Sequence, residues 1–184
     1  MKSISMTVLS ALGLTAVQAQ QNNEAKKSQP KSIVIYFSRT GNVEKLAHQI
    51  SEITGAPLIK LEPVTPYPPT YGETTEIVQD QMRKGIVPPI KPVNINLDDY
   101  DVIYLGSPTW WGHICRPMER FLSDHKLEGK RLMLFTSHGG SGEANTADDI
   151  RRLCPKSEVS NIAFYGSGVR SEAQLKNWIS RNVK

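Results

Sequence analysis

Cysteine is scarce in this chain, with only Cys115 and Cys154 among 184 residues. Two thiols are too few for a disulfide framework, so the fold must depend on a hydrophobic core. Beyond the N-terminus, no apolar run approaches the length of about 20 residues that a membrane-spanning helix needs. The sequence also lacks a fixed repeat and any long run of like charges, which excludes solenoids, coiled coils and wholesale disorder. One compact domain remains.

The N-terminus has the pattern of a segment that is removed. Lys2, an apolar stretch over 4–17 and compact side chains at 17–19 are typical of a cleavable secretory signal over residues 1–19. The alternative is an N-terminal membrane anchor, for which the apolar stretch is short. The polar segment 20–30 predicts a flexible leader, and residues 31–184 form the predicted folded domain. We therefore expect export across the inner membrane to the periplasm, with no membrane span after signal removal.

The rest of the chain alternates between predicted strands and helices. Continuous apolar runs without polar alternation predict central parallel strands that are buried on both faces. These runs cover residues 33–37, 102–105, 132–135 and 162–165, and a less hydrophobic strand is expected over 57–61. Apolar residues at helical spacing follow each strand, so we expect a parallel sheet covered by helices on both faces. The proline-rich stretch 62–100 predicts an elaborated crossover with one helix over 71–84.

A serine in a small polar loop follows each of the four apolar strands. These loops are 38–41, 107–109, 137–140 and 167–168. Because the carboxyl ends of parallel strands meet at one edge of a sheet, the loops should gather where open α/β sheets bind ligands.

The first of these loops has the composition of a phosphate site. Ser38 and Thr40 supply hydroxyls, and the following helix supplies backbone N–H groups and the positive end of its dipole. No Walker motif, cysteine nucleophile or phospho-accepting aspartate is present here, which argues against nucleotide triphosphate hydrolysis and phosphatase chemistry. The alternative is an ordinary helix start in which Gly41 makes a turn. Arg39 points either to the phosphate or to solvent.

Two consecutive tryptophans, Trp110 and Trp111, lie in a loop bounded by Pro108 and Gly112. Both rings cannot face a core, so at least one should be presented at the surface, where a flat aromatic ligand could stack on it. The other ring is expected to cover the end of the sheet.

Three motifs in order, TGN at 40–42, WWG at 110–112 and HGGSG at 138–142, make residues 31–184 resemble the flavodoxin family. The resemblance implies an α/β flavodoxin-like three-layer sandwich with a five-stranded parallel sheet of order 2-1-3-4-5, FMN as cofactor, and electron transfer. It implies three groups of FMN-binding residues: Ser38, Arg39, Thr40, Gly41, Asn42 and Val43 at the phosphate; Pro108, Thr109, Trp110, Trp111 and Gly112 beside the flavin ring; and Ser137, His138, Gly139, Gly140 and Gly142 at its pyrimidine edge. Val43 replaces a threonine that is common in the family, which removes one hydroxyl contact.

The sequence leaves three functions open. The first is an exported FMN-binding electron carrier, the second is an FMN-dependent NAD(P)H:quinone-type oxidoreductase, and the third is a binding module without a redox role. No second nucleotide motif is present, which favours the carrier, and no catalytic residue is assigned.

Charge and side-chain spacing give the remaining expectations. The net charge of +4 falls to +3 when the signal and its one charge, Lys2, are removed. We expect redox partner proteins with acidic surfaces and no nucleic acid, because the basic residues are scattered. The four histidines are too dispersed for a metal site. Cys115 and Cys154 should lie at opposite ends of neighbouring helices and remain free, buried thiols.

Overall fold

The computed structural model describes residues 30–166 and 172–183. The predicted signal over 1–19, the predicted leader over 20–30 except Pro30, and the predicted loop at 167–168 lie outside the described residues.

A parallel sheet forms the centre of the molecule. Its strands are β1 (Ser32–Tyr36), β2 (Leu58–Lys60), β3 (Val102–Trp110), β5 (Arg131–His138) and β6 (Glu158–Tyr165), in the order β2-β1-β3-β5-β6. This is the predicted order 2-1-3-4-5, so the expected fold class is confirmed. A sixth strand that the sequence did not predict, β4 (His113–Ile114), pairs antiparallel with the end of β3.

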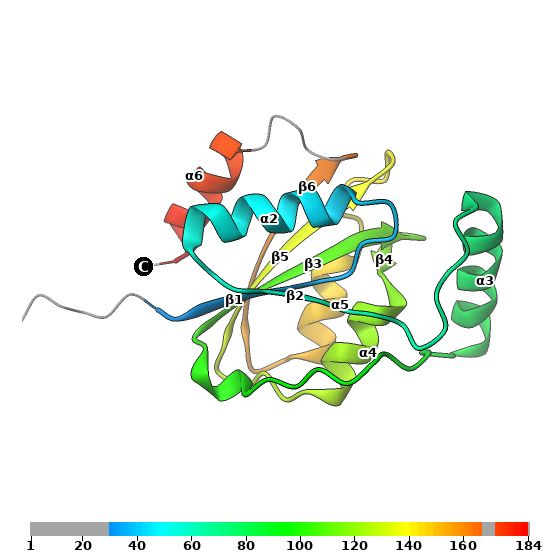
Figure 1. Ribbon diagram of the computed structural model, residues 1–184, viewed down its shortest axis with the longest axis horizontal. Helices are drawn as coiled ribbons and strands as arrows, with labels where there is room; N and C mark the ends of the chain where they lie inside the picture. Colours follow the sequence, from blue (N-terminus) through cyan, green and yellow to red (C-terminus); the bar gives the residue numbers. More distant parts are fainter. Residues whose placement is uncertain (1–29, 167–171, 184) are drawn as a thin grey trace, which may run out of the picture.

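Helices cover both faces of the sheet. Helices α2 (Asn42–Thr54) and α6 (Glu172–Asn182) cover one face, and α4 (Arg116–Asp124) and α5 (Thr146–Leu153) cover the other (Figure 1). None of the helices in the described part of the chain combines the length and the apolar composition needed to cross a membrane.

Adjacent residues of one strand pack into two separate hydrophobic cores. Val34 and Tyr36 pack under α2 and α6, while Ile33 and Ile35 pack against the side of α4 and α5. Burial on both faces is why these strands are continuously apolar rather than alternating. Cys115 and Cys154 are both free and buried, which confirms the predicted thiols.

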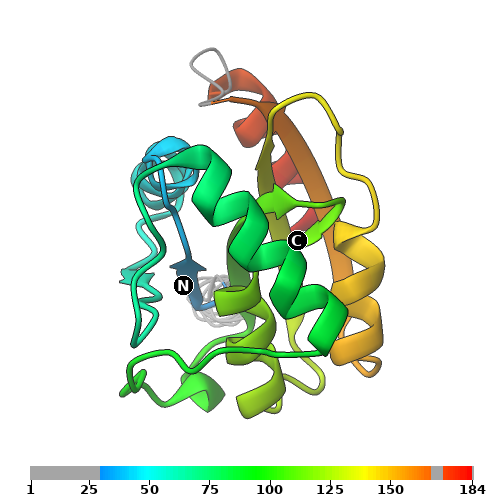
Figure 2. The ribbon, with the colours of Figure 1, turned by 90° about the vertical axis from the view of Figure 1, so that its right-hand side faces the viewer.

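The crossover from β2 to β3 leaves the body of the sheet. Its helix α3 (Tyr71–Lys84) has the predicted bounds, and the short 3-10 helix η1 (Leu97–Asp99) precedes β3. The two chain segments that flank α3 meet in an antiparallel bridge between Pro63 and Ile90. This bridge allows α3 to stand beyond the carboxyl ends of the strands, where it crosses in front of the sheet edge (Figure 2).

Candidate functional site

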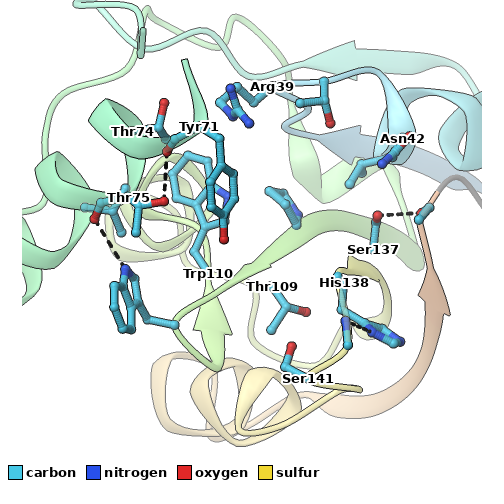
Figure 3. A pocket seen from close by; sticks show the side chains of 18 of the residues that line it. Arg39, Asn42, Tyr71, Thr74, Thr75, Thr109, Trp110, Ser137, His138 and Ser141 are labelled. Carbon is cyan, nitrogen blue, oxygen red and sulfur yellow. Dashed lines mark hydrogen bonds between the residues drawn. The ribbon is translucent and has the colours of Figure 1, made fainter. Parts of the chain in front are cut away.

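A cavity of about 640 Å³ opens at the carboxyl edge of the sheet. The loop after β1 and the carboxyl ends of β3 and β5, with the turns that follow them, form its base and one side, and α3 forms the opposite wall. The predicted loops at 107–109 and 137–138 are therefore wrong as loops, because these residues continue the strands. Figure 3 shows Thr74 and Thr75 of α3 on one side and Ser137 and His138 on the other. This volume lies within the range of small-molecule and cofactor sites, about 300–1,000 Å³. Of the predicted site residues, all line this cavity except Gly41 and Gly142.

The loop after β1 leads directly into α2 at the cavity. Gly41 precedes the helix with φ of 85°, a left-handed conformation that favours glycine, and its N–H donates to Oγ of Ser38 at 3.1 Å. No side chain caps the start of α2 within the described residues. The first N–H groups of the helix and the positive end of its dipole therefore remain available to an anion in the cavity.

Two side chains of this segment have other partners. Val43 is 1% exposed and packs with Leu46 in the core beneath α2. Arg39 extends to the crossover, where its Nη1 donates to the carbonyl oxygen of Pro69 at 2.8 Å. The guanidinium is thus held beside the cavity rather than directed wholly to solvent. It is the only Lys, Arg, Asp or Glu side chain among the described residues that line the cavity.

The double-tryptophan segment is the tip of a β-hairpin. Thr109 pairs with Ile114 and Trp110 pairs with His113, so Trp111 and Gly112 are the two turn residues. Both have positive φ, 52° and 80°, as a type I′ hairpin requires. Glycine suits the second position, whereas a tryptophan at positive φ is strained.

The hairpin gives the two indoles different environments. Trp110 is partly buried against the core and lies edge-on to Phe37 and Tyr67, with ring centroids 5.5 and 4.9 Å apart. Trp111 is 51% exposed, and its Nε1 donates to the carbonyl oxygen of Thr75 at 3.4 Å. The expected division of roles is therefore observed, with Trp111 presenting its ring.

Thr109 provides the clearest sign that the cavity accommodates a polar ligand. Its Oγ1 is buried and has no hydrogen-bond partner among the described residues, although the residue lines the cavity. Buried hydroxyls are nearly always hydrogen-bonded, because an unpaired one costs free energy. A ligand with a hydrogen-bonding group at this position would satisfy it.

The end of β5, at Ser137 and His138, and the loop that follows it close the third side. The hydroxyl of Ser137 donates to the carbonyl oxygen of Gly166 at 2.6 Å, and the N–H of Gly140 donates to Nδ1 of His138 at 3.1 Å. The His138 ring also lies edge-on to Tyr165, with centroids 6.0 Å apart. A Cβ at Gly139 or Gly140 would meet no atom within 4 Å, so this loop leaves open space at the cavity.

Sequence analysis missed the wall that α3 contributes. Tyr71, Thr74, Thr75 and Val78 line the cavity, and Ser141, Tyr165 and Gly166 do so from the other side. Ser141 lies inside the HGGSG motif and could have been included. No local signal marks the α3 residues, because their position depends on how the crossover folds back.

The described residues contain no group of three or more His, Cys, Asp and Glu side chains arranged to hold a metal ion. The chemistry of this cavity is instead that of hydroxyls, backbone N–H groups, one arginine and aromatic rings.

Comparisons with known proteins agree on the type of fold. A family model described as Flavodoxin matches residues 31–182. A candidate flavoprotein from Bacteroides eggerthii is 25% identical with a TM-score of 0.74, covering 84% of this chain and 99% of that one. A flavoprotein in complex with FMN from Lactobacillus acidophilus is 22% identical with a TM-score of 0.65, covering 81% and 98%. A candidate flavoprotein from Bacteroides uniformis is 23% identical with a TM-score of 0.67, covering 83% and 99%.

Proposed function

Because this chain belongs to the flavodoxin family, we propose that it binds FMN in the cavity beneath α3 and acts in electron transfer through that flavin. The observation that carries the proposal is that the loop after β1 and the ends of β3 and β5 meet at one cavity, which is lined by the uncapped start of α2 and by aromatic rings. Bound FMN would supply the redox chemistry, while the protein supplies binding, orientation and electrostatics.

The phosphate end is the loop after β1. The uncapped N–H groups at the start of α2 suit a phosphate dianion, and Ser38 and Thr40 line the same end. Arg39 is the matching cation, already held near the loop by Pro69. A Cβ at Gly41 would meet nothing within 4 Å, so the glycine serves the backbone conformation rather than tight packing.

The flavin ring would lie between the hairpin and the loop after β5. Trp111 offers an exposed aromatic face, and Thr109 offers an unpaired hydroxyl. On the other side, Gly139 and Gly140 leave room for the backbone to approach the polar edge of the ring. Trp110 contributes support rather than stacking, because its ring packs on Phe37 and Tyr67.

The proposal also covers where the protein acts and which partners it meets. We propose that residues 1–19 direct export and that the protein transfers electrons in the periplasm. The positive net charge, +4 for the whole chain and +3 without residues 1–19, favours partners with acidic surfaces, since charge complementarity speeds association.

A flavin-dependent NAD(P)H:quinone-type oxidoreductase is the second candidate. The wall formed by Tyr71, Thr74, Thr75 and Val78 favours it, because this wall extends the cavity beyond the three loops and could face a small second substrate. The two functions share the same FMN site.

The test starts with the purified full chain and FMN. We expect FMN fluorescence to be quenched on binding, riboflavin to bind more weakly because it lacks the phosphate, and the bound flavin to be reduced and reoxidised reversibly. Trp111→Ala should weaken FMN binding more than Trp111→Phe, which keeps a ring. A folded protein that takes up no FMN would refute the proposal.

A second measurement separates the two candidates. NADH or NADPH is added to the FMN-loaded protein with a soluble quinone, and pyridine nucleotide oxidation is followed by absorbance. Catalytic turnover would favour the oxidoreductase, and reduction only by a protein or chemical donor would favour the carrier. Tyr71→Ala serves as the probe of the α3 wall, since it should slow turnover without abolishing FMN binding.

A further inference from the structure

Asp149 of α5 is a buried carboxylate outside the proposed flavin cavity. Its side chain is 9% exposed. Its Oδ2 accepts the backbone N–H of Ile114 at 3.1 Å and lies 3.0 Å from Nδ1 of His113. The guanidinium of Arg152 lies 3.4 Å from Oδ1. Burying a carboxylate is costly unless its oxygens are hydrogen-bonded, and these partners surround it.

Asp149 contacts the strand that completes the tryptophan hairpin. Strand β4 is only two residues long, His113 and Ile114, and Asp149 contacts both. The backbone N–H of Ile114 therefore donates its hydrogen bond to a residue of α5. The residue before α5 adds a second link, because the N–H of Asn145 donates to the carbonyl oxygen of Gly112 at 2.9 Å.

The hairpin needs such support. Its ladder consists of two residue pairs, and a short two-stranded ribbon has little stability of its own. Trp111 has φ of 52°, and strained conformations of this kind persist only where surrounding contacts impose them. The start of α5 makes two of these contacts, to Ile114 and Gly112, in addition to the one that Trp111 makes with Thr75 of α3.

Asp149 contacts the hairpin from α5, outside the proposed flavin cavity. It lines a separate cavity of about 240 Å³ together with His113, Arg116 and Arg152, and it does not line the larger cavity. Asp149 therefore makes no direct contact with a ligand in the larger cavity, and its influence on how such a ligand is positioned must pass through the hairpin.

We propose that Asp149 is the positioning residue of the flavin site. By holding Ile114 and His113, it fixes the hairpin tip and with it the direction of the Trp111 ring. The part of this inference that concerns the flavin rests on the proposed function, whereas the part that concerns the hairpin is a property of the protein alone.

The first experiment needs no flavin. Amide hydrogen exchange of the full chain is compared between wild type, Asp149→Ala and the control Asp148→Ala, whose carboxylate is 76% exposed and pairs with Arg151. Loss of a hydrogen bond to a charged group should speed exchange of the hairpin amides by about tenfold or more in Asp149→Ala. Asp148→Ala should match the wild type. Unchanged protection of residues 110–113 in Asp149→Ala would overturn the inference.

The second experiment measures FMN affinity and the flavin midpoint potential in a double-mutant cycle with Trp111→Ala. Asp149→Ala should weaken FMN binding by about tenfold and shift the potential, but it should add little when Trp111 is already absent. Losses that simply add, or wild-type affinity and potential in folded Asp149→Ala, would overturn the positioning role. A wild type that binds no FMN would refute the proposed function, and the exchange experiment would then still decide the hairpin claim.

A more conservative variant covers the case in which Asp149→Ala does not fold. Asp149→Asn keeps the side-chain shape and one acceptor oxygen for Ile114. We expect effects on hairpin exchange and FMN affinity that lie between those of wild type and Asp149→Ala. Wild-type values in both measurements for Asp149→Asn, with Asp149→Ala unfolded, would count against the inference.

Discussion

The substitution Val43→Thr should lower the free energy of unfolding and raise the affinity of the protein for the phosphate of FMN. Val43 is 1% exposed in the core beneath α2 and also lines the cavity. Valine and threonine have the same shape, so Val43→Thr exchanges one buried methyl group for a hydroxyl. Without a partner, a buried hydroxyl costs about 1–3 kcal/mol, and we expect this loss of unfolding free energy in the protein without FMN.

Bound FMN should recover part of that loss. A hydroxyl that reaches the phosphate gains a hydrogen bond of about 1 kcal/mol, which corresponds to an FMN Kd about fivefold lower. Riboflavin has no phosphate, so its Kd should not change. Urea unfolding with and without FMN and titration calorimetry with both ligands measure these quantities.

Val34→Thr is the matched control for the stability and FMN affinity of Val43→Thr. Val34 is fully buried in the same core but does not line the cavity. It should lose stability in the same way and gain no FMN affinity. The reasoning fails if Val43→Thr is as stable as wild type without FMN, because the side chain would then not be in a dry core. It also fails if riboflavin gains as much affinity as FMN.

Three further outcomes test the fold. A Cβ at Gly106 would lie 2.5 Å from Cζ of Phe135, so Gly106→Ala should lower the unfolding free energy by about 1–3 kcal/mol, measured in urea. The hydrogen bond from Lys60 lowers the pKa of Glu44. The stability that the ionised Glu44 contributes is therefore present above about pH 4.3 and is lost as the pH falls through the lowered pKa. The difference in unfolding free energy between wild type and Glu44→Gln should accordingly close in acid. Burial raises the pKa of Cys115 to about 12, so a thiol reagent near neutral pH should modify it only after unfolding.

The sequence predicted the sheet well because its strands are buried on both faces. Neighbours such as Val34 and Ile35 enter different cores, and this produces the continuous apolar run that marks a central strand. The end of β3 was missed because residues 106–110 carry small, polar and turn-forming side chains. Strand β4 is too short to have a periodicity, so only the Trp111-Gly112 turn could have suggested it.

The candidate site was predictable where it depends on local sequence. A serine loop after a buried strand is visible in the sequence, and so is a pair of adjacent tryptophans. Which indole is exposed was not predictable, because it depends on the hairpin register that makes Trp111 a turn residue. The α3 wall was also hidden, since that helix buries only Thr74 and Val78 and is placed by the bridge between Pro63 and Ile90.

Helix α3 connects the two ends of the proposed site. The segment before it accepts a hydrogen bond from Arg39 at Pro69, and the helix itself accepts one from Trp111 at Thr75. The residue proposed to meet the phosphate and the residue proposed to face the ring are thus both bound to the same crossover. A ligand that draws on either side chain would therefore also change a contact of the crossover, at Pro69 for Arg39 or at Thr75 for Trp111. The crossover therefore belongs to the proposed binding site.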